Sequence, residues 1–156
     1  MIKEEVKKRL TGKFKDWLIK SPKRVYFVID KKDLKEVATI LYKDMGLRLS
    51  TVTGLENEKN FELIYHFGYD KSGELFNLRV FIEDKINPEI DSLTDIFKAS
   101  NWVEREINEM LGINFIGHPN LNHLLLEDSW PKGEFPLRKD FPLKQSYPLE
   151  EDREGE

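Results

Sequence analysis

The sequence contains no cysteine among its 156 residues. This absence excludes disulfides, cysteine-ligated zinc, cysteine-held iron–sulfur clusters and thiol nucleophiles. Long hydrophobic runs are also lacking: the longest, at residues 25–29, falls far short of the roughly 18 residues that indicate a membrane span, and no signal-peptide pattern opens the chain. We therefore expect a cytoplasmic protein, and we expect any redox cofactor close to it to belong to a neighbouring protein.

Sequence signatures of catalysis are missing too. There is no Gly-x-Ser-x-Gly elbow, no Gly-rich phosphate loop and no dinucleotide fingerprint. Glu104 and Glu106 lie on a predicted helix, where a spacing of two residues separates them by about 200° and prevents them from sharing a small site. A zinc site would require the fold to collect His66, His118 and His123, because no two of them have helical spacing. We predict no catalytic residue, no metal site and no cofactor.

The charge is small in total but unevenly distributed. The net charge is −4, residues 1–24 carry nine basic against three acidic residues, and residues 150–156 carry five acidic residues against Arg153. Residues 1–149 are consequently neutral overall, which argues against a nucleic-acid-binding module. The basic N-terminal segment leaves one alternative open, a free-standing module that binds an anionic membrane or nucleic acid through its charged surface.

The hydrophobic periodicity predicts a mixture of helices and strands. An amphipathic helix is expected from Ile2 to Leu18, ending before Ser21 and Pro22, because apolar residues recur every three to four positions. Strands are expected at 25–29, 47–53, 61–69 and 74–83, with a hairpin turn at 70–73. Two more helices are expected from capping pairs, one from Asp33 and Glu36 to Gly46 and one from Ser92 and Asp95 to about Ser100, followed by a helix at 102–111 before Gly112.

This order of elements is typical of an α+β fold, a two-layer α/β domain with a mixed or antiparallel sheet that has one covered and one wetter face. We expect the domain to comprise residues 1–112 and an extended C-terminal tail to comprise residues 113–156. On the helix at 102–111, Arg105 and Glu109 are four residues apart and are predicted to form a surface ion pair. His118, before Pro119, is predicted to tie an irregular loop to backbone groups or to a partner.

The tail has no helical or strand period, yet it is rich in proline and aromatic residues. Without a period it cannot bury a second core, although its rings are unfavourable to leave in water. Proline keeps a chain extended and reduces the entropy lost on docking. We predict that the tail docks on another protein, with the alternative that it folds back on its own sheet. The residues concerned are Trp130, Phe135, Phe141 and Tyr147, with prolines at 119, 131, 136, 142 and 148.

Three segments of the second half resemble one protein family. They are ASNWVEREINEMLGINFIGHPNL from Ala99, LLLED from Leu124 and PLRKDFPL from Pro136. Together they resemble the C subunit of respiratory complex I, the NADH:quinone oxidoreductase, and the corresponding subunit of energy-converting membrane-bound nickel–iron hydrogenases. The resemblance is specific from about Trp102 to Leu143, whereas residues 1–90 match only in layout.

The resemblance implies a peripheral subunit without a cofactor, on the inner face of the cell membrane. In the family, the tail runs along the large hydrogenase-like subunit, and iron–sulfur subunits are neighbours. The resemblance assigns loop anchoring and contact with other subunits to its matching residues, and we expect Trp130, Pro136 and Phe141 to join them. The expected interface residues are Glu104, Arg105, Glu106, Gly117, His118, Pro119, Trp130, Pro136, Arg138, Lys139, Asp140 and Phe141.

Overall fold

The computed structural model describes residues 1–141. Tyr147 and the prolines at 142 and 148, which the tail prediction includes, lie outside them. The described part contains three α-helices, short 3-10 and π-helical turns, and seven strands. In chain order these are α1 (Ile2–Arg9), β1 (Lys15–Ser21), β2 (Arg24–Val28), η1 (Lys31–Asp33), α2 (Leu34–Thr39), η2 (Ile40–Asp44), β3 (Arg48–Glu56), β4 (Phe61–Tyr69), β5 (Glu74–Ile82), β6 (Glu89–Asp91), α3 (Ser100–Leu111) and β7 (Asn114–Ile116).

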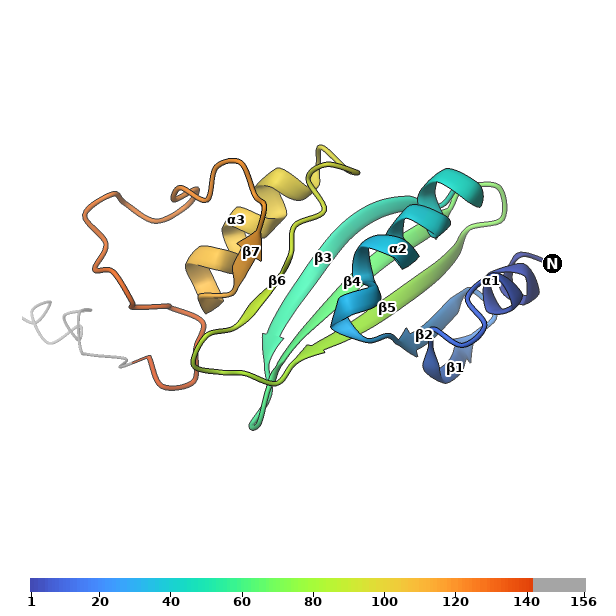
Figure 1. The fold of residues 1–156 in the computed structure, drawn as a ribbon, viewed down its shortest axis with the longest axis horizontal. Helices are drawn as coiled ribbons and strands as arrows, with labels where there is room; N and C mark the ends of the chain where they lie inside the picture. The colour runs from blue at the N-terminus through green and yellow to red at the C-terminus, as the bar shows by residue number, and fades with distance from the viewer. Residues whose placement is uncertain (142–156) are drawn as a thin grey trace, which may run out of the picture.

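Five strands form one mixed sheet in the order β1-β2-β5-β4-β3 (Figure 1). The β2–β5 pair is parallel and the other neighbouring pairs are antiparallel. β4 and β5 form the predicted hairpin, and Gly73 in its turn has a φ of +76°, which a residue with a Cβ rarely adopts. The predicted α+β class with a two-layer domain is confirmed.

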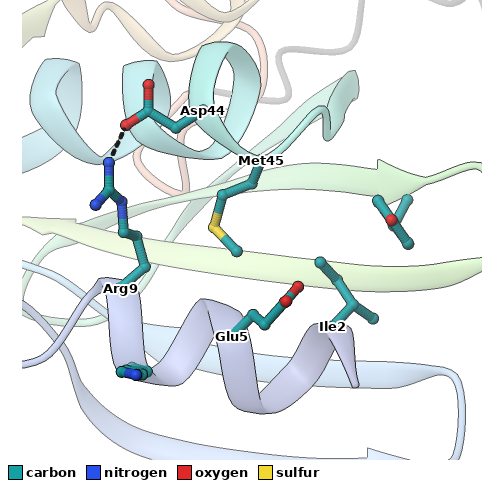
Figure 2. Close-up of a pocket in the computed structure, with 7 residues that line it drawn as sticks. Ile2, Glu5, Arg9, Asp44 and Met45 are labelled. Carbon is teal, nitrogen blue, oxygen red and sulfur yellow. Dashed lines mark hydrogen bonds and ion pairs between the residues drawn. The ribbon is translucent and has the colours of Figure 1, made fainter.

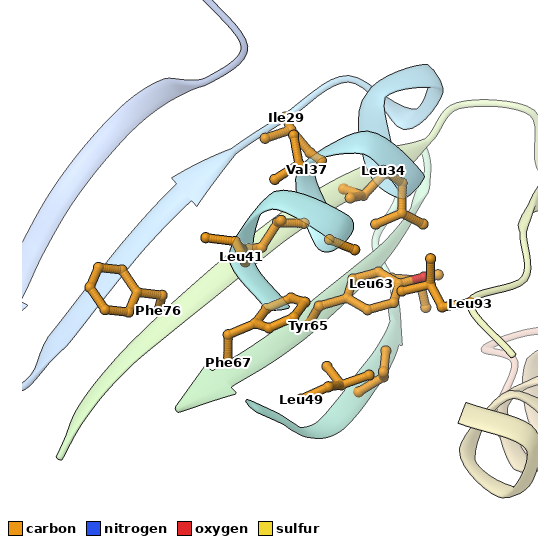
Figure 3. Packing of buried hydrophobic residues seen from close by; sticks show 14 of the residues in the cluster. Ile29, Leu34, Val37, Leu41, Leu49, Leu63, Tyr65, Phe67, Phe76 and Leu93 are labelled. Carbon is orange, nitrogen blue, oxygen red and sulfur yellow. The ribbon is translucent and has the colours of Figure 1, made fainter. Parts of the chain in front are cut away.

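The core lies between the helices and one face of the sheet. Alternate residues of β4, including Leu63, Tyr65 and Phe67, are fully buried on that face. Leu34 and Leu41, from α2 and η2, pack over them (Figure 3). The apolar side chains of α1 join the same core, so this helix uses its hydrophobic stripe within the chain. Burial of these side chains supplies the main free energy that holds the two layers together.

The opposite face of the sheet is polar and partly exposed, as the alternating pattern predicts. Three side chains form a hydrogen-bonded ladder across it. Thr53 Oγ1 lies 2.9 Å from His66 Nε2, His66 Nδ1 lies 2.5 Å from Asn77 Oδ1, and Asn77 donates to the Val25 carbonyl at 3.1 Å. The Asn77 oxygen can only accept, so the His66 proton is on Nδ1. The His66 side chain of β4 therefore links the neighbouring strands β3 and β5 through hydrogen bonds.

Helix α3 lies beside β3, at one end of the sheet (Figure 1). Gly54 permits this approach, because a Cβ at that position would lie 3.1 Å from both Ile107 Cγ2 and Leu111 Cδ1. After α3, β7 pairs in parallel with β6, and Ile113 and Phe115 are buried in the core. The division between domain and tail at residue 112 stays a prediction, and in the described residues the core extends past it.

The first predicted helix is too long. α1 ends at Arg9, and β1 begins at Lys15 after a turn in which Gly12 has a φ of +82°. Two of the apolar residues assigned to its second half reach the core from the β1 region: Phe14 and Trp17 pack their rings on Phe27, with centroids 6.2 and 5.3 Å away. Leu18, also assigned to this half, is 57% exposed. The spacing of three between Phe14 and Trp17 fits a helix, but ring contacts from the β1 region determine the structure.

The two predicted capping pairs are wrong as caps. Residues 92–99 form turns after β6 and not a helix, and Ser92 bonds to Glu104, whereas Asp95 pairs with Lys35 at 3.3 Å. A helix does start near Asp33, as predicted, but no side chain caps it. Ser92 and Asp95 thus form tertiary contacts with Glu104 and Lys35, and neither side chain caps a helix here.

The core packing gives a direct test. Leu63→Ala should lower the free energy of unfolding by about 2–5 kcal/mol, because Leu63 is fully buried and the surrounding side chains cannot all close the cavity. Ile86→Ala is the control: Ile86 is 88% exposed, and its loss should change the stability by less than about 0.5 kcal/mol. Chemical denaturation of both variants measures the difference, and equal effects would contradict the assignment of the core.

Candidate interaction surface

Charged side chains of helix α3 bind the segments that precede and follow this helix. Glu104 is fully buried and accepts hydrogen bonds from Ser92 Oγ at 2.6 Å and from the Leu93 amide at 2.7 Å. Burial raises the pKa of Glu104 to about 7, because its bonds to Ser92 and Leu93 offset only part of the cost of removing the carboxylate from water. Glu104 thus anchors the segment before α3 from within the core.

The His118 ring anchors the loop after β7. Its Nε2 donates to the Asn101 carbonyl at 3.0 Å, and its Nδ1 accepts from the Asn120 amide at 2.9 Å. This pattern fixes the neutral tautomer with the proton on Nε2. The side chain is fully buried, 4.0 Å from Glu104. The prediction that His118 ties an irregular loop to backbone groups is confirmed.

Arg105 and Glu109 bind the backbone of the loop at residues 122–126. Arg105 donates to the carbonyls of Asn122 and His123 at 3.1 and 2.9 Å. Glu109 is buried and accepts from three successive amides, and these bonds are 2.9, 2.7 and 3.3 Å long. The amides are those of Leu124, Leu125 and Leu126. The predicted ion pair between Arg105 and Glu109 is wrong, because each side chain satisfies backbone groups of residues 122–126.

Residues 135–139 of the tail fold back on the end of α3. Gly112 has a φ of +76°, and a Cβ there would lie 2.5 Å from the Phe135 ring, so this helix end must be glycine. Arg138 donates to the Leu111 carbonyl at 2.6 Å, and the Lys139 amide donates to Glu56 at 2.7 Å. Within the described residues, residues 135–139 therefore contact α3 and, through Glu56, the end of β3, which meets the alternative of a tail folded back on its own sheet only in part.

Two tail rings contact each other in place of the core. Trp130 stacks on Phe141 with centroids 6.0 Å apart, and its Nε1 donates to the Glu134 carbonyl at 2.8 Å. Both rings remain half-buried. Two leucines of the same region are more exposed: Leu125 at 63% and Leu137 at 64%. Residues 117–141 thus display apolar side chains on backbone that α3 fixes.

The predicted interface residues differ in their position along α3 and in their exposure. Arg105, Gly117 and Pro119 line one depression of about 600 Å³ together with the exposed Trp102. Arg138 lies at the other end of α3. Glu106, Lys139 and Asp140 are exposed, whereas Pro136 is half-buried. The side chains of Glu104 and His118 are buried, so these two residues can affect an interface only through the loops to which they bond. The sequence does not single out Trp102, Leu125 and Leu137 as interface residues. For Leu125 and Leu137 the signal is a single apolar residue in a segment without a period, whereas Trp102 is part of the periodic helix α3.

Within residues 1–141, no three or more potential metal ligands gather, so the fold does not bring His66, His118 and His123 together. A cavity of about 550 Å³ lies between α1 and η2, where Arg9 pairs with Asp44 at 2.6 Å beside Met45 (Figure 2). It is an open hollow with one exposed ion pair. Among the described helices, none combines the length and apolar character that crossing a bilayer requires.

The buried carboxyl of Glu104 predicts how stability depends on pH. Its pKa rises from 4.5 to about 7 on folding, so the native state binds the proton more tightly than the unfolded state. The stabilisation is complete below pH 4.5 and is lost as the pH rises through 7. Denaturation at pH 5 and pH 8 should show a falling unfolding free energy for the wild type, by at most about 3 kcal/mol, and a flatter dependence for Glu104→Gln. Identical slopes would contradict the assignment.

The grip on residues 122–126 can be tested at Glu109. Glu109→Gln leaves one acceptor oxygen for three amides, so stability should fall by about 1–3 kcal/mol, and amides 124–126 should exchange with deuterium faster. Glu106→Gln is the matched control, three residues earlier on the same helix but exposed, and should leave both measurements unchanged. Unchanged exchange in Glu109→Gln would show that these bonds do not hold the loop.

Similar proteins confirm the resemblance. The family model of the respiratory-chain NADH dehydrogenase 30 Kd subunit matches residues 27–147. The C subunit of the F(420)H(2) dehydrogenase of Methanosarcina mazei is 37% identical over 84% of this chain and 86% of its own length. The C subunit of the NADH-quinone oxidoreductase of Chelativorans sp. is 29% identical over 86% of this chain and 68% of its own length.

Two solved structures share the fold. A chain of the membrane-bound sulfane sulfur reductase, an archaeal respiratory membrane complex, superposes with a TM-score of 0.81 at 20% identity, covering 91% of this chain and 84% of that one. A trypsin-resistant fragment of Nqo5 has a TM-score of 0.64 at 26% identity, covering 78% of this chain and all of the fragment. The chain is a subunit of a complex I-type or related membrane respiratory complex, and it belongs to the respiratory-chain NADH dehydrogenase 30 Kd subunit family.

Proposed function

We propose that this chain is a structural subunit without an active site of its own, which docks on the large hydrogenase-like subunit of its complex through residues 113–156. The iron–sulfur subunits of the complex are its further neighbours, and the complex holds it at the inner face of the membrane. Electron transfer then takes place in the neighbouring subunits, and this chain contributes to their assembly.

The observation that carries this proposal is a set of apolar side chains displayed on fixed backbone. Leu125 is 63% exposed, yet its amide is held by Glu109 at 2.7 Å. Leu137 is 64% exposed, and its amide donates to the Met110 carbonyl at 3.0 Å. Apolar groups that are exposed and already ordered lose little entropy on docking, which is the property of an interface.

The names of the relatives support a structural role. One relative is a subunit of an F(420)H(2) dehydrogenase and another of an NADH-quinone oxidoreductase. The same kind of subunit thus occurs with different electron donors. A subunit in contact with the donor would have to differ between them, whereas one that holds other subunits together need not.

The alternative of a free-standing module on an anionic membrane has less support. It requires an exposed apolar stripe on the basic N-terminal helix. In α1 the stripe is turned inward: Val6 and Leu10 are fully buried, and Ile2 is 9% exposed. The basic side chains of this segment are left on a surface without a helical apolar face to insert.

Leu125→Glu and Leu137→Glu test the docking. Each should reduce the recovery of the native complex with a tagged full-length chain by about tenfold or more, since each places a charge in an apolar contact. The circular dichroism spectrum and the thermal unfolding of the chain should not change, because both residues are exposed. Ile86→Glu is the matched control, at a site 88% exposed outside the proposed interface. Full recovery of the complex with both variants would contradict the proposal.

A further inference from the structure

Strand β3 forms one edge of the five-stranded sheet, and α3 lies next to it (Figure 1). Two adjoining hollows, of about 370 and 290 Å³, run between the two elements and share Thr51, Val103 and Glu106 as lining residues. They form one groove, named here the β3–α3 groove. It extends along β3 from Leu49 to Gly54.

The backbone of β3 is unpaired on the side of this groove. β3 pairs only with β4, and no other backbone group of residues 1–141 bonds to its outer edge. A free edge offers a row of N–H and C=O groups, which an extended peptide satisfies and a helix or lipid chain does not. At about 3.3 Å per residue, the six residues 49–54 can pair with a segment of similar length.

The walls of the groove are mainly apolar. Val52 and Ile107 are buried at its floor, and Val103 and Met110 are half-buried on the α3 side. Trp102, 64% exposed, closes one end of the α3 wall. Side chains of an added strand alternate between the two faces, so every second residue would meet these apolar walls.

One charged group lies in the wall. Glu106 is exposed on α3 and lines both hollows, and none of the residues 1–141 forms an ion pair or hydrogen bond with its side chain. A carboxylate beside apolar surface selects a partner with a basic side chain, because any other occupant would leave it desolvated and unpaired.

The groove is continuous with the surface proposed above for docking. Leu124, in the loop held by Arg105 and Glu109, lines one end, and the exposed Leu137 lines the other. A partner that contacts residues 117–141 therefore reaches the groove without leaving its interface.

From these features we infer that the β3–α3 groove accepts an extended segment of a partner subunit, which adds a strand to β3, places apolar side chains on alternate positions against α3 and pairs a lysine or arginine with Glu106. This inference rests on the proposed function, because it assigns a second contact to the same complex. It assigns to β3 and α3 a binding role in addition to that of the tail.

Hydrogen exchange tests the added strand. The tagged full-length chain is compared by mass spectrometry alone and in its purified native complex. Amides within residues 48–54 should exchange at least about tenfold more slowly in the complex, whereas β1, at the opposite edge of the sheet, should be unchanged. A complex that assembles with unaltered exchange at 48–54 overturns the groove inference and leaves the tail-docking function intact. A chain that joins no respiratory complex overturns both.

Photocrosslinking identifies the occupant. A benzoyl-phenylalanine at position 51, where Thr51 is exposed, should crosslink in the native complex to a peptide of a partner subunit with alternating apolar residues and a basic residue. A crosslink to residues 142–156 of the same chain, to a helical segment or to lipid overturns the inference, as does the absence of any crosslink from an assembled complex.

Charge reversal tests the role of Glu106. Glu106→Lys should reduce recovery of the complex about tenfold or more, because the partner's basic side chain would then meet a like charge. Glu4→Lys is the matched control, an exposed glutamate on α1. Equal recovery of both variants overturns the ion pair, and a normal loss in Leu125→Glu, at a tail residue that lines neither hollow, shows in the same experiment that the tail contact is still measured.

Discussion

The surface of this protein depends on two buried carboxylates of one helix. Glu104 and Glu109 lie on α3, are almost completely buried, and use their oxygens to bind backbone amides of irregular segments. Glu104 binds the segment before the helix and Glu109 the loop after it. Irregular backbone has amides with no regular partner, and a buried amide left unpaired costs about 1–3 kcal/mol. Helix α3 therefore supplies hydrogen-bond acceptors for these amides, which a β-sheet would otherwise provide.

This arrangement shows how a segment without helical or strand period could carry the proposed interface. Arg105 completes the set of bonds by donating to two carbonyls, so the loop at 122–126 is held through acceptors and donors alike. Residues 135–138 of the tail are fixed at the other end of α3, where Arg138 binds the Leu111 carbonyl and Phe135 packs over Gly112. Leucine side chains can stay exposed on such a frame because its order does not depend on burying them.

The sequence predicts the structure correctly where a local pattern and the tertiary contacts agree. The strands at 61–69 and 74–82 alternate with a clear period of two, and Gly112 ends α3 as its position indicates. The prediction from sequence fails where a side chain bonds to residues that are distant along the chain. Arg105 and Glu109 have the spacing of a surface ion pair, and only the return of the loop to α3 shows that both serve its backbone. His118 was predicted correctly because a histidine before proline in an irregular loop has few other uses.

The two edges of the sheet differ in a way that fits only one of them for strand addition. β1 carries lysines near both ends and two irregularities in its pairing with β2, and Asp16 within it has a φ of +54°. Charges and bulges of this kind twist an edge away from other strands and keep it soluble. β3 has a single irregularity, between Leu49 and Thr51, and continues regularly to Glu56. Since both edges belong to one sheet, protection at β1 together with a regular, groove-lined β3 supports the proposal that a strand of a partner adds to β3.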